Sequence, residues 1–252
     1  MSIAISRLLT ALDEYLDTAA ISDYCPNGLQ VEGRTQVQRI ISGVTASQAL
    51  IDAAIERKAD AILVHHGYFW KGENPVITGM KQRRIKSLLL HDINLLAYHL
   101  PLDIHAEVGN NVQLAKRLEL SITGPLEAGN PRSVGLLGEL AEPLSSEQFA
   151  ARISHALQRA PMVIDAGKPI RTVAWCTGGA QSYIEHAIAA GVDAFITGEI
   201  SEHSTHSALE NGISYFAAGH HATERYGVQA LGEWLADRFG IEHEYVECPN
   251  PV

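Results

Sequence analysis

The sequence predicts an α/β protein with two duplicated, intertwined lobes and mainly parallel or mixed sheets. Short runs of Val, Ile and Ala alternate with segments of helical periodicity along the chain. This alternation is typical of sheets covered by helices. The second half repeats the pattern of the first, and 252 residues suffice for two lobes that each bury a core.

Composition excludes several classes of protein. Hydrophobic residues make up 46% of the chain and charged residues 19%, the balance of a globular protein. The formal net charge of −10 argues against sequence-specific or general nucleic-acid binding, and no apolar run approaches the roughly 20 residues of a membrane span. The amino terminus lacks a signal-peptide pattern, and the three cysteines form no CxxC pair. We therefore expect a cytoplasmic protein with no membrane partner.

The first half begins with an amphipathic helix and continues as alternating strands and helices. Residues 2–17 carry Leu8, Leu12 and Leu16 on one helical face, and a Pro-Asn-Gly turn follows at 26–28. The later elements are expected as a strand at 39–44, a helix at 46–58, a strand at 60–64, a helix at 81–92, a strand at 93–103 that runs into a loop, and a helix at 108–120.

The Gly- and Pro-rich segment 121–133 is the expected boundary between the lobes. We expect residues 1–125, joined by the C-terminal 225–252, to form the first lobe, and residues 126–224 the second. Beyond the boundary we expect strands at 133–140, 161–164, 171–179, 192–199, 213–219 and 243–248, and helices at 145–157, 181–191, 202–212 and 223–239.

The two halves echo each other in sequence. Matched without gaps, Gln48 falls on Gln181, Asp60 on Asp193, and His65 and His66 on Gly198 and Glu199. With one residue of slack, His99 and Asp103 match His220 and Glu224, since both pairs have the spacing H-x₃-acid. Any two βαβ units look alike to some degree, but agreement over nearly thirty residues favours a duplication. A pseudo-dyad would then bring polar strand ends of both lobes to one cleft.

Two adjacent histidines, His65 and His66, end the apolar strand at 60–64. A single histidine is more often packed or exposed than a ligand, but two at the carboxyl end of a buried strand lie where open α/β sheets bind ligands. Neighbouring side chains on a strand diverge, so the pair would serve two ions rather than share one.

The second half offers a histidine and a carboxylate at helical spacing. His220 and Glu224 share a helix face if the helix begins near residue 220. His221 with Glu224 is the rival pair, and the duplication favours His220. Asp103 is expected in an extended loop after Pro101. It would be an ordinary turn residue, but its match to Glu224 makes it the candidate second carboxylate.

Three imidazoles and two carboxylates suit two divalent ions per subunit. Mixed nitrogen and oxygen ligands favour Zn, Mn, Fe, Co or Ni over Ca. Bridging carboxylates suggest ions roughly 3.5–4 Å apart, in a cleft between the lobes, which activate a water molecule. The metal identity stays open.

Other residues are candidates for catalysis or substrate binding. Glu199 is a candidate general base or a helix cap, and His99 a candidate proton carrier or a core histidine. Tyr68 and Trp70 are candidates to stack on a base, and Lys81 to meet a phosphate. P-loop, dinucleotide-binding and serine-hydrolase motifs are absent from the sequence.

Six segments together resemble the GTP cyclohydrolase 1 type 2 family, also called Nif-three-like proteins: AISDYCPNGLQVEG, GVTAS, DAILVHHGYFW, YHLPLD, DAFITGE and GHHATER. The resemblance covers essentially the whole chain and is to the short bacterial form. It implies a duplicated α/β fold, a dinuclear metal centre and a toroidal homohexamer. The family's metal ligands carry over onto His65, His66, Asp103, His220 and Glu224.

The family name implies hydrolytic opening of the guanine imidazole ring of GTP with loss of formate. We therefore expect a metal-dependent hydrolase whose substrate is a small molecule, such as a nucleotide. The alternatives are a phosphoesterase or amidohydrolase that uses the same two ions, and a hexameric metal-binding scaffold without turnover.

Overall fold

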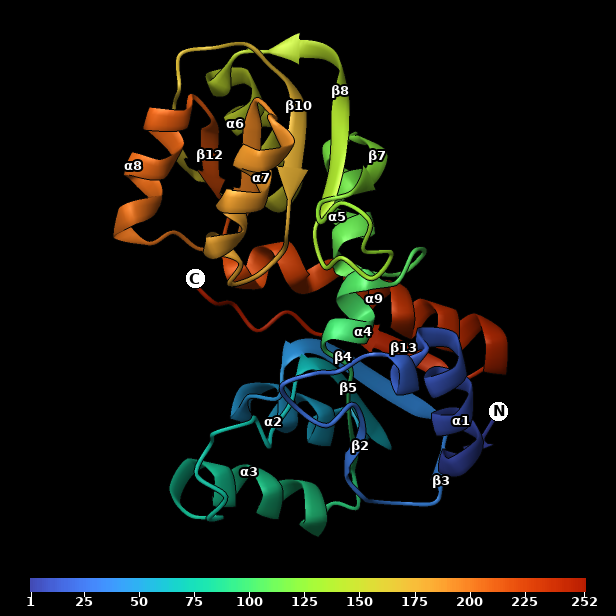
Figure 1. The fold of residues 1–252 in the computed structure, drawn as a ribbon. Helices are drawn as coiled ribbons and strands as arrows, with labels where there is room; N and C mark the ends of the chain where they lie inside the picture. The colour runs from blue at the N-terminus through green and yellow to red at the C-terminus, as the bar shows by residue number, and fades with distance from the viewer. The chain divides into compact units, whose positions relative to one another are not determined.

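The computed structural model describes residues 1–252 and divides into two compact units. Unit 1 comprises Met1–Val108 and Gly227–Pro249, and unit 2 comprises Gly109–Tyr226 and Asn250–Val252. The expected α/β class is confirmed: parallel and mixed sheets are covered by helices (Figure 1). None of the helices is both long and apolar enough to cross a membrane.

Unit 1 is built on a five-stranded sheet of order β13-β4-β5-β6-β2. β13, β4, β5 and β6 run parallel, and β2 pairs antiparallel with β6. Its elements are β1 (Ile3–Ala4), α1 (Ile5–Leu16), η1 (Thr18–Ala20), β2 (Gly28–Val31), β3 (Gln36–Val37), β4 (Arg39–Thr45), α2 (Gln48–Glu56), β5 (Ala61–His66), α3 (Gly79–Leu90), β6 (Asn94–Ala97), α4 (Leu100–Ile104), the distal part of α9 (His220–Phe239) and β13 (Glu242–Tyr245).

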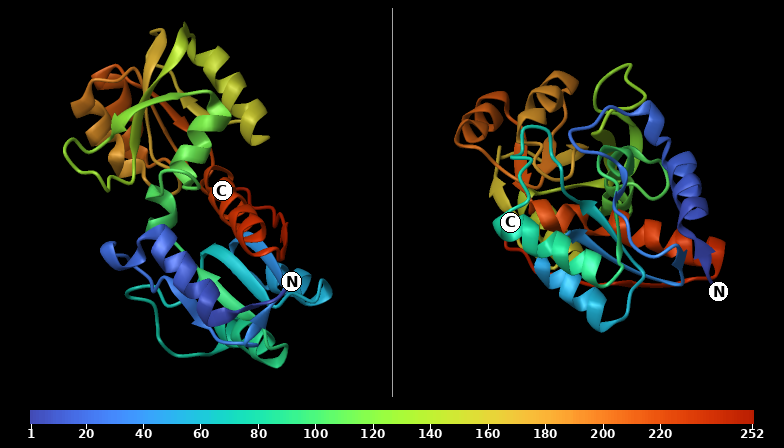
Figure 2. Two further views of the ribbon diagram at one scale, coloured as in Figure 1. Left: turned by 90° about the vertical axis from the view of Figure 1, so that its right-hand side faces the viewer. Right: turned by 90° about the horizontal axis from the view of Figure 1, so that it is seen from below.

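The strands of unit 1 are apolar because both faces of the sheet are covered. Successive side chains point to opposite faces, so Leu63 and Ile62 enter different cores. On the Leu63 face the sheet packs against α1 and the distal part of α9. On the Ile62 face it packs against α2 and α3 (Figure 2). Near-continuous Val, Ile and Leu runs are typical of parallel strands buried on both sides.

Unit 2 is built on a six-stranded sheet of order β7-β8-β10-β11-β12-β9. β10, β11 and β12 run parallel, and the other pairings are antiparallel. Its elements are α5 (Asn110–Leu118), β7 (Ser121–Pro125), β8 (Leu136–Leu144), α6 (Ser146–Leu157), β9 (Met162–Ile164), β10 (Ile170–Trp175), η2 (Gln181–Tyr183), α7 (Ile184–Ala190), β11 (Ala194–Thr197), α8 (Glu202–Asn211), β12 (Ser214–Ala217) and the start of α9.

Both units repeat one order of elements. A helix and an antiparallel strand precede three parallel strands joined by helices: α1 and β2 before β4, β5 and β6, and α6 and β9 before β10, β11 and β12. The registers agree, because Ala61 pairs with Ile40 as Ala194 pairs with Val173. By the same register, His99 in unit 1 is equivalent to Gly219 in unit 2, the residue before His220. The sequence match therefore corresponds to a shared topology.

The boundary between the units differs from the expected one. Residues 109–125, expected in the first lobe, belong to unit 2, because Leu114 and Leu118 of α5 pack in its core and β7 pairs with β8. The C-terminal segment returns to unit 1 as β13, but Asn250–Val252 belong to unit 2. Local Gly and Pro content did not reveal this division because packing decides it.

Asp103 lies in a helix rather than in the expected extended loop. β6 ends at Ala97, and α4 begins at Leu100 with Pro101 in its first turn. Proline is favoured there, because the first N–H groups of a helix have no intrahelical acceptor. The helix presents Asp103 from its first turn.

Candidate metal centre

Unit 1 brings together His65, His66 and Asp103 at the carboxyl end of its parallel strands. His65 and His66 are the last residues of β5, and their rings lie 4.6 Å apart. His65 is fully buried, and its Nε2 lies 3.5 Å from Oδ1 of Asp103. The predicted first-lobe half of the site is thus assembled within one unit.

Both histidines of the pair are held through Nδ1. His65 Nδ1 lies 3.0 Å from the carbonyl oxygen of Tyr98. A carbonyl only accepts hydrogen bonds, so Nδ1 carries a proton, and Nε2 is the nitrogen that faces Asp103. His66 Nδ1 lies 3.4 Å from the Thr45 hydroxyl. Hydrogen bonds to the nitrogen that does not bind the ion hold metal-binding imidazoles in their coordinating orientation.

A third imidazole, His99, joins the pair. Its ring centroid lies 5.0 Å from that of His65 and 5.8 Å from that of His66. One ligand nitrogen from each of the three lies within 4.8 Å of the others. His99 Nδ1 lies 2.7 Å from Oδ1 of Asp23, a carboxylate that the sequence analysis did not single out.

Cys25 lies beside Asp23 and His99. Burial, aided by the negative charge of Asp23, raises the pKa of the Cys25 thiol to about 12. Without a bound ion, a thiol with this pKa is protonated at neutral pH, and a metal ion would have to displace that proton.

Unit 2 brings together His220, Glu224 and Glu199. α9 begins at His220, so the i, i+4 spacing places His220 Nε2 3.2 Å from Oε2 of Glu224. His220 Nδ1 lies 2.7 Å from Oε1 of Glu199, which follows β11. The structure pairs Glu224 with His220, the partner that the duplication favoured over His221.

The two carboxylates dominate the charge state of His220. Burial by itself lowers its pKa, but the hydrogen bonds and charges of Glu224 and Glu199 outweigh burial and raise the pKa to about 9. Without a metal ion, His220 is therefore a positively charged imidazolium at neutral pH, with a proton on each ring nitrogen. A metal ion at Nε2 would displace the proton there. The donors in each unit, imidazole nitrogen beside carboxylate oxygen, fit a divalent transition-metal ion.

Gly178 allows the close approach of Glu224. It lies just beyond β10 with φ at +72°, and a Cβ there would overlap a carboxylate oxygen of Glu224 and lie 2.9 Å from its Cδ. The Gly178 N–H donates to the Thr223 hydroxyl. The Gly178-Gly179 turn therefore makes room for a candidate ligand, and its first N–H is already engaged within the protein.

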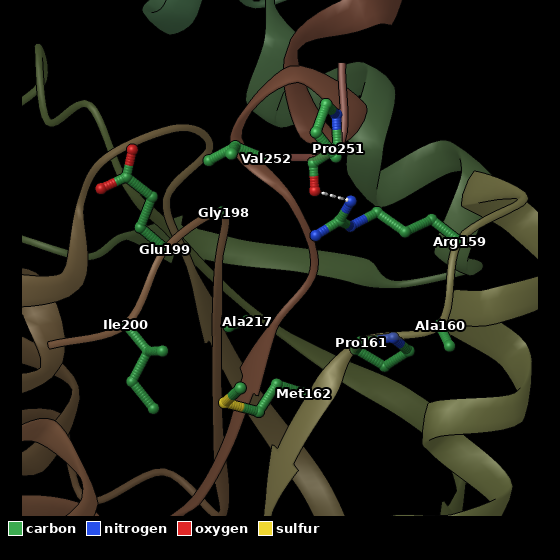
Figure 3. Close-up of a pocket in the computed structure, with 10 residues that line it drawn as sticks. All are labelled: Arg159, Ala160, Pro161, Met162, Gly198, Glu199, Ile200, Ala217, Pro251 and Val252. Atoms are coloured by element: carbon green, nitrogen blue, oxygen red, sulfur yellow. Dashed lines mark hydrogen bonds between the residues drawn. The ribbon is translucent and has the colours of Figure 1, made fainter. Parts of the chain in front are cut away.

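A cavity of about 710 Å³ adjoins Glu199 within unit 2 (Figure 3). In Figure 3, Glu199 and Arg159 lie on opposite sides of it, Ile200 lies on the same side as Glu199, and Met162 lies at the bottom. Arg159 donates to the carbonyl oxygen of Pro251, and its Nε is buried without a hydrogen-bond partner. The volume suits a small molecule, and the guanidinium supplies a positive charge at one end.

Tyr68 and Lys81, two predicted substrate contacts, interact with other residues of the protein. Tyr68 is buried, and its hydroxyl donates to the carbonyl oxygen of Ala46, so it does not offer a stacking face. Lys81 forms an ion pair with Glu73 and lies over the ring of Phe69. Trp70, in contrast, lies beside His99 at the candidate metal centre, with the two rings nearly perpendicular and their centroids 4.9 Å apart.

Fold and site together define a class: a duplicated α/β protein with a histidine- and carboxylate-rich candidate metal centre at the carboxyl ends of its parallel strands. The family model described as DUF34/NIF3 (NGG1p interacting factor 3) matches residues 3–251. The chain belongs to this family, as its resemblance to Nif-three-like proteins predicted.

Curated relatives and solved structures agree with this assignment. The chain is 68% identical to a protein from Pseudomonas aeruginosa named GTP cyclohydrolase 1 type 2 homolog, with 100% of both chains covered. A Vibrio cholerae protein of the same name is 58% identical, with 98% of each covered. Among solved structures, the protein ybgI, described as of unknown function, superposes with a TM-score of 0.96 at 51% identity and covers 99% of this chain and 100% of its own.

Proposed function

We propose that this protein is a metal-dependent hydrolase with a dinuclear centre whose ligands are His65, His66, Asp103, His220 and Glu224. One observation carries the proposal. At the carboxyl end of its parallel strands, each unit sets the Nε2 of a histidine beside a carboxylate, His65 with Asp103 and His220 with Glu224. Other residues hold Nδ1 of both histidines. Bound ions would supply a water molecule acidic enough to attack at neutral pH.

A nucleotide is the proposed substrate. The relatives carry the name GTP cyclohydrolase 1 type 2 homolog, and that chemistry is the hydrolytic opening of the guanine imidazole ring with release of formate. The cavity beside Glu199 supports a small-molecule substrate, because Arg159 can hold a phosphate group and Met162 and Ile200 can contact an apolar face. Trp70 offers a further aromatic edge near His99.

Metal analysis tests the ligand assignment. We expect purified protein reconstituted with Zn, Mn, Fe, Co or Ni to hold two ions per chain. Asp103→Asn in unit 1 and Glu224→Gln in unit 2 should each lower that number, because each removes an anionic ligand without changing side-chain size. Glu202→Gln is the matched control, since Glu202 is exposed on α8. Unchanged metal content in Glu224→Gln would show that the assignment is wrong.

A formate-release assay with GTP tests the reaction. Metal-loaded protein should release formate, and metal removal by a chelator should abolish the release. Hydrolysis of a phosphate ester without formate would indicate a phosphoesterase, and full metal content without turnover would indicate a scaffold. Either result would overturn the proposed reaction and leave the assignment of the metal ligands unchanged.

We further propose a homohexamer in the cytoplasm. Val76 and Ile77, just before α3, and Met80, in its first turn, expose apolar side chains that an assembly would cover. All three cysteines are free thiols, as a reducing compartment favours. Sedimentation of the purified chain measures the assembly directly, and a monomer at micromolar concentration would contradict it.

A further inference from the structure

Each unit contains one carboxylate that holds a histidine through Nδ1. In unit 1, Oδ1 of Asp23 lies 2.7 Å from Nδ1 of His99. In unit 2, Oε1 of Glu199 lies 2.7 Å from Nδ1 of His220. An ionised carboxylate only accepts hydrogen bonds, so each pair places a proton on Nδ1 and leaves Nε2 to act on whatever it faces.

The two pairs differ in what Nε2 faces. His220 Nε2 faces Glu224, and both belong to the proposed metal ligands. Glu199 therefore orients a ligand, which is the usual task of a carboxylate hydrogen-bonded to a metal-binding histidine. His99 is not one of the five proposed ligands, although its ring lies beside those of His65 and His66.

Asp23 is buried and is held in place by several hydrogen bonds. Its side chain is only 3% exposed. Oδ2 accepts hydrogen bonds from the Asn27 side chain at 2.9 Å and from the Leu100 N–H at 2.9 Å. Burial by itself raises its pKa, but the hydrogen bonds from His99 and Asn27 lower it to about 2, so Asp23 is ionised at neutral pH.

The same turn also holds the backbone and the ring of His99. Oδ1 of Asn27 accepts a hydrogen bond of 2.7 Å from the His99 N–H, and Trp70 lies edge-on to the ring. The turn at 23–27 therefore holds the ring of His99 beside the histidine pair. A ring that is held by Asp23 at Nδ1, flanked by Trp70 and still 14% exposed is suited to contact a bound small molecule.

We propose that Asp23 is a positioning residue that keeps His99 in the Nδ1–H tautomer, so that His99 Nε2 receives a proton from the attacking water. This inference rests on the proposed hydrolase. As the water oxygen bonds to the electrophilic carbon, one of its O–H bonds breaks and an N–H bond forms at Nε2. Asp23 stabilises the resulting imidazolium. His99 then returns the proton to the nitrogen that leaves when its bond to that carbon breaks. Glu199 acts only by orienting His220.

Nitrogen-15 NMR of histidine-labelled full-length protein tests the tautomer without any assay of turnover. The resonances of His99 are assigned by their loss in His99→Gln. The unsubstituted chain should show protonated Nδ1 in His99. Asp23→Asn should shift His99 toward the Nε2–H tautomer, because the amide can donate to Nδ1. An unchanged His99 tautomer in a folded Asp23→Asn protein would overturn the proposal.

Metal content and formate release separate the roles of the two carboxylates. Asp23→Asn should lower kcat by about 100-fold or more and keep two ions per chain. Glu199→Gln should weaken metal binding by about 10-fold or more. Asp52→Asn, which changes an exposed carboxylate on α2, is the control and should do neither.

Loss of metal in Asp23→Asn, or full metal affinity in Glu199→Gln, would overturn this division of roles. Should the unsubstituted protein release no formate, the proposed reaction fails. The NMR and metal measurements still decide the roles of Asp23 and Glu199.

Discussion

At the scale of single residues, the site depends on which ring nitrogen each histidine presents. The Tyr98 carbonyl, Asp23 and Glu199 hold Nδ1 of His65, His99 and His220, respectively. In all three rings Nε2 is therefore the atom available to a ligand. The absence of a side chain at Gly178 matters as well, because it leaves the space that the Glu224 carboxylate occupies.

Replacing Gly178 by alanine should damage the site more than the fold. The new methyl group would overlap the carboxylate of Glu224 and displace it. Gly191→Ala is the matched control, because Gly191 has a similar φ of +67° and no atom within 4 Å of the added Cβ. Both variants should lose about 1 kcal/mol of unfolding free energy to backbone strain. Only Gly178→Ala should also lose metal affinity, by about tenfold or more, as measured by competition with a chelator.

At the scale of elements, both units begin their central strands in the same way. Asp60 accepts the N–H groups of Gln38 and Arg39 at the start of β4. Asp193 accepts those of Arg171 and Thr172 at the start of β10. Each aspartate sits before the next parallel strand and ties it to its neighbour, so the sequence match of Asp60 to Asp193 reflects a shared structural task.

The Asp193 interaction should appear in the pH dependence of stability. Burial by itself raises the pKa of Asp193, but the N–H groups of Thr172 and Arg171 outweigh burial and hold the pKa below 3.8. A carboxyl with a lowered folded-state pKa stabilises the protein above its unfolded pKa, and this contribution falls as the pH drops below about 4. Asp193→Asn should therefore be destabilised at pH 6, and the difference from the unsubstituted chain should shrink toward pH 3.

Urea unfolding at a series of pH values measures that difference. Asp237→Asn serves as the control, because Asp237 is exposed on α9. A loss in Asp193→Asn that stayed constant from pH 6 to pH 3 would contradict the interpretation.

At the scale of the whole molecule, the two units depend differently on the continuity of the chain. Unit 1 needs its C-terminal segment, because Val228, Leu231 and Leu235 fill the core beside α1, and β13 extends the sheet next to β4. Unit 2 is one continuous segment from Gly109 to Tyr226, apart from the last three residues.

Fragments of the chain should therefore behave unequally. A fragment of residues 109–226 should fold alone and unfold cooperatively on heating, since it keeps both cores of its sheet. A fragment of residues 1–108 should not, because removal of α9 exposes one apolar face of its sheet. Circular dichroism during heating distinguishes them, and a cooperative transition in the 1–108 fragment would refute this expectation.

Much of the fold follows from local patterns. The parallel strands lie close to where apolar runs predicted them, because strands buried on both faces require such runs. α6 begins where Ser145 and Gln148 form a capping box. β7 and α4 were not expected. β7 exists because β8 is available to pair with it, and α4 is a single short element that carries little periodicity.

The sequence by itself determined the α/β class, the duplication, the family and the positions of the candidate ligands, because each is encoded in residues that lie close together in the chain. Only the tertiary structure decided where the units divide, that Asp103 lies on a helix, and that Glu199 holds His220. It also decided that Asp23 holds His99, a hydrogen bond between residues 76 positions apart. Contacts at such distances arise from how strands and turns pack, so they leave no periodic pattern in the sequence.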